Sequence, residues 1–247
     1  MSAGRKYAQP PVVEAVCQFV LSADTPWDIT VPGLFYEKLK DEFPYHETRI
    51  YRGVGIRVPE QDQPQFLFGE EPVLALFSES RTMLVQLGPR VLTVNCLKSY
   101  PTWPVFRSKI ERAWFSLKEV LEIKGLELVR LQYINQIKIP EFPEDLQDCF
   151  TIYPHFGPLP VSNIVMFIVG ALLTFHDGRD RCRLQLNNPS EEERQTVILD
   201  IEYSLTRPGD LGLEAIPQWL EEAHDRIENI FESSITDRLR TTFQLEA

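Results

Sequence analysis

The residues whose types and spacing most suggest a metal or acid–base site are Glu221 and His224. They lie three positions apart in a segment of helical periodicity near the end of the chain. Carboxylate-bridged di-iron proteins use this Glu-x-x-His spacing, but such a centre needs two of these motifs and two further glutamates on four packed helices. The chain has one motif. Apolar residues recur around it at helical spacing from Ile216 to Ile235, and His224 lies at the margin of that stripe. We therefore predict a structural or boundary histidine and no metal site.

Other catalytic signatures are absent from the sequence. His46, His155 and His176 are far apart, and none lies in a nucleophile–histidine motif. No P-loop, Gly-x-Ser-x-Gly, Gly-x-Gly-x-x-Gly or His-Glu-x-x-His sequence occurs. The four cysteines are single, without a Cys-x-x-Cys pair, which favours reduced structural thiols over a zinc or redox site. These absences favour a protein that is not an enzyme and that needs no cofactor.

Three arginines alternate along a short basic stretch, RDRCRLQL. If this stretch is a strand, its period of two places Arg179, Arg181 and Arg183 on one face. Such a row of arginines would bind an anion, an RNA backbone or an acidic segment of a partner protein. In the structural alternative, a neighbouring strand presents Asp200 and Glu202 outward, and ion pairs between the strands neutralise the arginines. We favour the structural alternative.

Two polar residues interrupt otherwise apolar strand-like segments. Glu14 lies in an alternating segment on the face opposite Val13 and Ala15, and Asn135 falls on the inward face of its own segment. A buried amide that finds no partner costs about 1–3 kcal/mol. We therefore expect Asn135 to bond a bulge or loop backbone, with a ligand-facing role as the alternative. Glu14, Asn135 and His224 join the three arginines as candidate binding residues.

The elements that position these residues follow from hydrophobic periodicity and turn signals. The first part of the chain predicts strands and two helices, with strands over 12–22, 45–51, 64–68, 73–78, 82–87 and 90–96 and helices over 31–43 and 103–124. The pattern then recurs, with strands over 126–139, 162–175, 180–187 and 196–205, a Pro-rich connector with one helical turn over 140–160, and a long helix over 213–242. Turn sequences at 88–90 and 176–180 predict hairpins.

The order of elements predicts an α+β fold made of two similar halves, 1–125 and 126–247, packed together as one unit. Each half reads strand, helix or connector, antiparallel strands and long helix, which is typical of a curved antiparallel sheet with one face covered by helices. This order resembles the TATA-binding-protein-like and helix-grip architectures, a likeness of fold and not of function. No residue-by-residue repeat accompanies it.

The net charge of −11 is unevenly distributed along the chain. Residues 1–125 hold 15 basic and 15 acidic residues, whereas residues 126–247 hold 10 basic and 21 acidic residues. Because nucleic-acid affinity depends on cations that displace phosphate counterions, the second half is disfavoured as a nucleic-acid binder and favours a basic protein surface. The longest apolar run, 164–175, is shorter than the roughly 18–20 residues that cross a bilayer. With no signal peptide at the start, we expect a cytoplasmic protein without a membrane anchor.

Three sequence motifs also carry a family resemblance. They are Pro-Pro-hydrophobic-x-Glu at 10–14, Arg-x-x-Tyr-Ile-Asn at 130–135 and Phe-Glu-x-x-Ile-Thr-Asp at 231–237. With them, the chain resembles a sporadically distributed family of conserved hypothetical prokaryotic proteins of about this length. The shared positions here are Pro11, Glu14, Tyr133, Asn135, His224, Phe231 and Thr236. The resemblance implies no catalytic residue, and a sporadic distribution is typical of mobile, defence-linked genes.

Three functions remain open from the sequence. We favour a non-enzymatic protein that works through protein–protein contact, for example as an accessory or regulatory subunit of a prokaryotic defence system such as a CRISPR-associated one. The alternative is a nucleic-acid-binding or RNA-processing protein that uses Arg179, Arg181 and Arg183. A further alternative is a small-ligand pocket between sheet and long helix, as in helix-grip proteins.

Overall fold

In the computed structural model, all strands join one antiparallel sheet. The structure describes residues 7–57, 65–139, 146–155, 157, 164–189 and 195–244, with the backbone alone over 51–57 and 65–71. The sheet has nine strands in the order β2-β3-β4-β5-β1-β6-β9-β8-β7, and every neighbouring pair is antiparallel. The strands are β1 Val12–Leu21, β2 Tyr45–Arg57, β3 Gln65–Phe77, β4 Met83–Gly88, β5 Val91–Leu97, β6 Leu126–Lys138, β7 Ile168–Phe175, β8 Asp180–Asn187 and β9 Thr196–Leu205.

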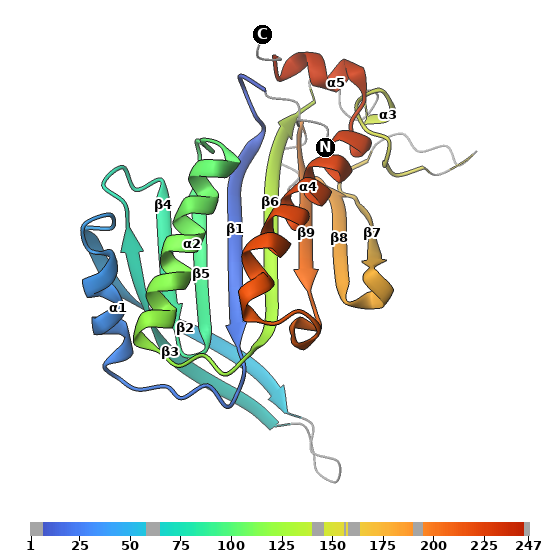
Figure 1. The fold of residues 1–247 in the computed structure, drawn as a ribbon. Helices are drawn as coiled ribbons and strands as arrows, with labels where there is room; N and C mark the ends of the chain where they lie inside the picture. The colour runs from blue at the N-terminus through green and yellow to red at the C-terminus, as the bar shows by residue number, and fades with distance from the viewer. Residues whose placement is uncertain are drawn as a thin grey trace.

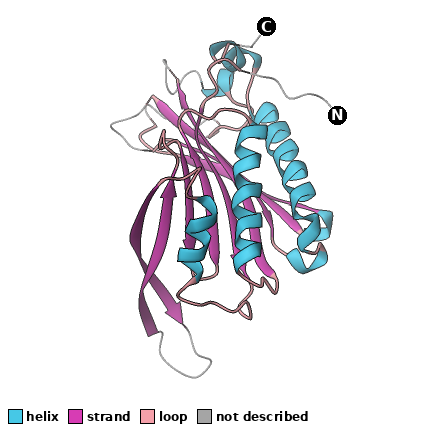
Figure 2. Ribbon diagram, turned by 60° about the vertical axis from the view of Figure 1, so that its left-hand side comes forward, coloured by secondary structure: helices cyan, strands magenta, loops and turns pink. Residues whose placement is uncertain are grey.

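Three of the helices cover one face of this sheet (Figures 1 and 2). They are α1 Val31–Leu39, α2 Trp103–Val120 and α4 Ile216–Ser234, and the two short helices are α3 Leu146–Cys149 and α5 Asp237–Thr242. In both views the opposite face carries no helix from the described residues, and we call it the open face. The expected α+β class, with antiparallel strands and helices on one side, is confirmed.

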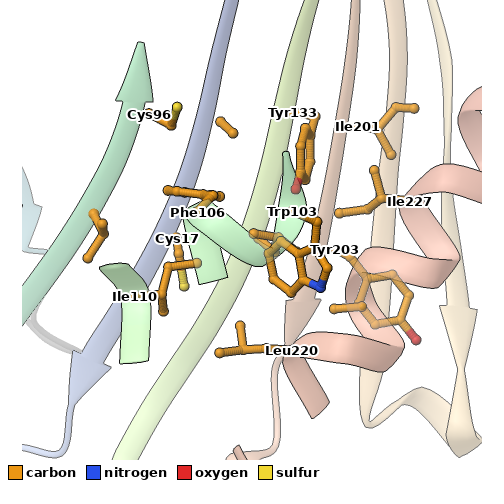
Figure 3. Close-up of a cluster of buried hydrophobic side chains, with 14 of the residues drawn as sticks. Cys17, Cys96, Trp103, Phe106, Ile110, Tyr133, Ile201, Tyr203, Leu220 and Ile227 are labelled. Atoms are coloured by element: carbon orange, nitrogen blue, oxygen red, sulfur yellow. The ribbon is translucent and has the colours of Figure 1, made fainter. Parts of the chain in front are cut away.

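The core lies between the sheet and the helices because the strands alternate. Ala15, Cys17, Phe19 and Leu21 of β1 are fully buried, while the alternate residues face the open side. Side chains from β1, β5, β6 and β9 meet the apolar faces of α2 and α4 in one cluster (Figure 3). Phe19 stacks on Trp114 of α2 with ring centroids 4.7 Å apart.

The strands of the two chain halves occupy separate blocks of the sheet. Strands that precede residue 125 form a block of five, and those that follow it form a block of four. The blocks meet where β1 pairs with β6 in antiparallel register along nearly their whole lengths. The halves therefore differ in strand number, although both supply a long helix to the same face.

Two predicted strands, 64–68 and 73–78, are one continuous strand in the structure. β3 pairs with β2 through thirteen residue pairs, including Ile50 with Pro72. Proline cannot donate to a ladder and is tolerated where a strand has a neighbour on one side only. β3 meets β4 only over its last four residues, so Pro72 lies in such a position and does not end the strand.

Both long helices end earlier than the periodicity predicts. α2 stops at Val120 instead of Lys124, and Leu121 already has extended backbone angles. The predicted helix over 213–242 is interrupted at Ile235 and Thr236, which are also extended. Ile235 forms a β-bridge with Phe150, and the Thr236 hydroxyl accepts a hydrogen bond from the Leu239 amide as the N-cap of α5. The bridge between Ile235 and Phe150 and the cap at Thr236 therefore divide the segment, although its apolar periodicity predicts one continuous helix.

No helix among the described residues is long and apolar enough to span a membrane.

Adjacent residues of α2 give a direct test of this packing. Trp114→Ala should lower the free energy of unfolding by about 3–5 kcal/mol because it removes a buried aromatic ring, whereas Phe115→Ala should change it by less than about 0.5 kcal/mol. Trp114 is 2% exposed and Phe115 is 45% exposed. Guanidinium unfolding of both variants measures the difference. Equal losses would contradict the described face of α2.

Candidate functional site

His224 lies in a hydrogen-bonded chain between α4 and the sheet. Its Nδ1 is 3.2 Å from the Tyr133 hydroxyl of β6, which is 2.9 Å from the Tyr100 hydroxyl. Its Nε2 is 3.3 Å from a carboxylate oxygen of Glu228. The Trp103 ring of α2 stacks on the imidazole with centroids 4.3 Å apart and an interplanar angle of 14°. Both ring nitrogens therefore have partners.

The hydrogen-bond partners of His224 also limit the chemistry that His224, Tyr133 and Tyr100 can perform. A carboxylate at Nε2 favours the tautomer that carries hydrogen there, so Nδ1 accepts from Tyr133. Burial raises the pKa of Tyr133 and of Tyr100, which keeps both as neutral hydroxyls at pH 7. The hydrogen bonds from His224 to Tyr133 and from Tyr133 to Tyr100 thus join α4 to the sheet.

Glu221, which shares the Glu-x-x-His motif, points to other partners. Its Oε1 accepts a hydrogen bond of 3.0 Å from Trp103 Nε1 and forms an ion pair with Arg107 of α2. These contacts tie α4 to α2. Across the parts of the chain that the structure describes, no group of three or more His, Cys, Asp or Glu residues could hold a metal ion.

Asn135 faces the core and is 2% exposed. Its Nδ2 donates a 3.0 Å hydrogen bond to the backbone oxygen of Leu199 on β9. The residue also lies opposite Val12, where the register of β1 shifts before Glu14. The amide therefore bonds the strand backbone of β9, in a stretch of regular β6–β9 pairing, and not the bulge or loop backbone that we expected.

The predicted ladder of three arginines is wrong for Arg179. β8 begins at Asp180, and Arg179 lies in the preceding hairpin loop. Its guanidinium binds the buried Asp180 carboxylate through Nε at 3.0 Å and Nη2 at 2.7 Å. Asp180 also accepts hydrogen bonds from the Tyr203 hydroxyl and from Trp219 Nε1, both at 3.3 Å. A buried carboxylate needs a cationic partner, and this need turns Arg179 away from the strand face.

Arg183 forms ion pairs with the neighbouring strand, as the structural alternative predicts. β8 pairs with β9, and Arg183 Nη2 lies 3.0 Å from Asp200 Oδ2 and 3.4 Å from Glu202 Oε2. Arg181 is exposed and stands opposite Ser204 on β9 and Thr174 on β7. The described residues offer Arg181 no carboxylate within ion-pair distance. Of the three arginines, Arg179 is therefore half-buried in an ion pair with Asp180, Arg183 is paired with carboxylates across the ladder, and Arg181 has no ion-pair partner among the described residues.

Glu14 belongs to a polar network on the open face. Its Oε1 accepts a 2.7 Å hydrogen bond from Asn95 Nδ2, and Asn95 Oδ1 accepts a 3.0 Å bond from Gln86 Nε2. Further along the same face, Gln132 donates to Asp200 at 2.8 Å. The candidate residues are thus divided between two faces: Glu14, Arg181 and Arg183 lie on the open face, and Asn135 and His224 lie on the helix side.

The candidate site that sequence reasoning missed is the edge of the sheet at β7, whose outer side pairs with no other strand of the described residues. Ile168 is 69% exposed, Leu172 63% and Leu173 37%, and Met166 just before the strand is 67% exposed. Figure 1 shows no strand or helix from the described residues beside β7 on its outer side. The available signal was the apolar run 164–175, which lacks the polar alternation of a half-buried strand.

The two edges of the sheet differ in a way that points to binding at β7. Proteins protect edge strands with charges, prolines or bulges, because unpaired N–H and C=O groups recruit other strands. The opposite edge, β2, has the sequence YHETRIYRGVGIR and contains one glutamate and three arginines. The sequence of β7, IVGALLTF, contains no charge and no proline. At Gly170 the backbone approaches β8 so closely that a Cβ would lie 2.2 Å from the Leu184 oxygen.

Comparison of the sequence with family models found no match, and comparison with curated proteins found none either.

The role of His224 can be separated from that of a binding residue. His224→Ala should lower the free energy of unfolding by about 1–3 kcal/mol, because the buried Tyr133 hydroxyl loses its acceptor. Asp225→Ala, at the next and exposed position of α4, should change it by less than about 0.5 kcal/mol. Thermal or denaturant unfolding measures both. Unchanged stability in the His224 variant would contradict the structural role.

The cysteines offer a second test of burial. Cys17, Cys96, Cys149 and Cys182 are buried, and burial raises the pKa of Cys96 to about 11 and that of Cys182 to about 12. The thiolate is the reactive form, so at pH 8 the native protein should react only slowly with an aromatic disulfide reagent. All four thiols should react at once in guanidinium. A rapid native reaction would show an accessible thiol.

Proposed function

We propose that the protein works by binding another protein, which adds a strand to the free edge at β7. The observation that carries this proposal is the exposed, uncharged and unbroken strand Ile168–Phe175 at one end of a sheet whose other end is charged. Strand addition supplies main-chain hydrogen bonds for affinity and uses alternate side chains for specificity. The rigid nine-stranded sheet holds that edge ready for a partner.

The contacts of the other candidate residues support this function over the alternatives. Nucleic-acid binding would need an array of free cations. Arg181 alone remains of the three-arginine ladder, in a chain of net charge −11. A ligand pocket between sheet and long helices would need space where Trp103, Tyr133 and His224 are buried against one another.

We also infer that the two halves are related by duplication in the TATA-binding-protein-like manner. From the centre outward the first half runs β1, β5, β4, β3, β2 and the second runs β6, β9, β8, β7. In each half the first strand is central, the last strand lies beside it and a long helix follows. This shared winding supports the inference, although the second half has one strand fewer.

The resemblance to a sporadically distributed family of conserved hypothetical prokaryotic proteins suggests the setting, because such a distribution is typical of defence-linked genes. We place the interaction in the cytoplasm, with an accessory or regulatory role in a prokaryotic defence system. The proposed cytoplasmic and defence-related setting rests on this resemblance and on the amino-acid composition. The proposal that a partner binds the β7 edge does not depend on it.

A charge placed on the edge should abolish partner capture. Leu172→Lys adds a cation to β7 at an exposed position, where it disfavours an added strand while folding is preserved. Ile50→Lys makes a similar change on the opposite edge, at a residue that is 61% exposed. Tagged protein expressed in its native host should recover a stoichiometric partner with the wild-type and Ile50→Lys chains, and lose it with Leu172→Lys.

Circular dichroism and unfolding curves should show that both variants remain folded. Recovery of the same partner by all three chains would argue against β7 as the site. Recovery of no partner by the wild-type chain would argue against the function itself.

A further inference from the structure

The arginines near β7 define what kind of segment it binds. Among the arginines whose side chains the structure describes, Arg81, Arg181 and Arg226 have no carboxylate within ion-pair distance, whereas the others have acidic partners. Two of these three, Arg181 and Arg226, flank the same end of β7. Two arginines without an ion-pair partner among the described residues therefore lie at one end of the edge strand, in a chain with eleven more acidic than basic residues.

The two arginines lie on opposite faces of the sheet at that end. Arg181 of β8 is on the open face and is paired in register with Thr174. Arg226 of α4 lies on the helix side, with its guanidinium carbon 5.3 Å from the ring centroid of Phe175. Thr174 and Phe175 are consecutive residues of β7, so their side chains point to opposite faces.

A strand added to β7 would present acidic side chains to both arginines from neighbouring positions. Strands lie about 4.8 Å apart, so an added strand would lie about 10 Å from β8, with only the short Thr174 side chain between. The long Arg181 side chain can cross that distance toward a carboxylate opposite Thr174. The next residue of the added strand faces Phe175 and Arg226. Asp180, the carboxylate of β8, is buried and bonded to Arg179, so it does not neutralise either arginine.

The exposed apolar residues of β7 and the direction of pairing determine the rest of the partner segment. Ile168 and Leu172 are exposed on the open face, and Leu173 is exposed on the helix side. All strands of the sheet are antiparallel, and antiparallel pairing is slightly more stable per residue than parallel pairing. An antiparallel segment has its N-terminal end beside Phe175.

We propose that the occupant of the β7 edge is an extended segment of a partner protein that begins with two consecutive acidic residues and continues with apolar residues. The acidic pair binds Arg181 and Arg226, and the apolar residues cover Ile168, Leu172 and Leu173. This inference rests on the proposed function, whose partner it specifies by chemistry.

Three synthetic octapeptides test it against the full-length protein by fluorescence anisotropy. Each has six alternating valines and threonines, with two glutamates at the N-terminal end, two glutamates at the C-terminal end, or two lysines at the N-terminal end. The glutamate-first peptide should bind at least about fivefold more tightly than the other two, since each exposed ion pair is worth up to about 1 kcal/mol. Its affinity should fall as salt is added.

Arginine variants supply the matched controls. Arg181→Gln and Arg226→Gln should each weaken the glutamate-first peptide about two- to fivefold, and Arg81→Gln, at an arginine remote from β7, should leave it unchanged. The double variant Arg181→Glu, Arg226→Glu should instead prefer the lysine-first peptide. These exposed substitutions leave the fold intact, which circular dichroism checks.

The outcomes separate this inference from the function on which it rests. Equal binding of the glutamate-first and lysine-first peptides would overturn the acidic pair while leaving edge binding in place. Failure of every peptide to bind would also overturn it, whatever the pull-down recovers. A dimer of the wild-type chain in sedimentation that dissociates with Leu172→Lys would show that a second copy covers the edge, and would overturn it as well.

Discussion

The antiparallel pairing of β1 with β6 holds the molecule together, because it is the place where the two blocks of strands become one sheet. Ala15, Cys17, Phe19 and Leu21 of β1 can be buried only if the sheet is continuous beneath α2 and α4. One of the two irregularities in this pairing, between Val12 and Glu14, is accompanied by Asn135, whose amide bonds the next strand. Stability and shape therefore depend on a long-range contact between residues more than a hundred positions apart.

The position of β1 and β6 at the centre explains why the edges are so far from the core. In each half the chain passes from its central first strand to the edge strand and then returns inward strand by strand, so β2 and β7 lie at opposite edges of the sheet. The buried polar groups serve this framework: His224, Tyr133 and Tyr100 join α4 to β6, and Asp180 gathers Arg179, Tyr203 and Trp219 at the β7–β8 turn. The arginines that could still form ion pairs with another protein lie at the surface, and two of them, Arg181 and Arg226, lie beside the β7 edge.

Local pattern predicted most strands and both long helices, because alternation and helical period are properties of neighbouring residues. It correctly placed β1, β6, β8 and β9, and the pairing of Arg183 with Asp200 and Glu202. It failed where distant contacts decide: Ile235 leaves the helix to meet Phe150, and Arg179 leaves the strand face to meet Asp180. The sequence shows the apolar run that contains β7, but not its place at the edge, since an apolar strand is central or peripheral according to strand order, which local pattern does not contain.

The β2–β3 hairpin has a consequence of another kind. Its strands stay paired with each other beyond Val73, where β3 no longer has β4 as a neighbour, and they project past the body of the sheet (Figure 1). A two-stranded ribbon is marginally stable in water and twists more than a wide sheet. This arm therefore has its own opening equilibrium, and its amides should exchange with solvent while the amides of β1 and β6 stay protected. We therefore expect the arm and the centre of the sheet to open as separate cooperative units, the arm more readily than the centre.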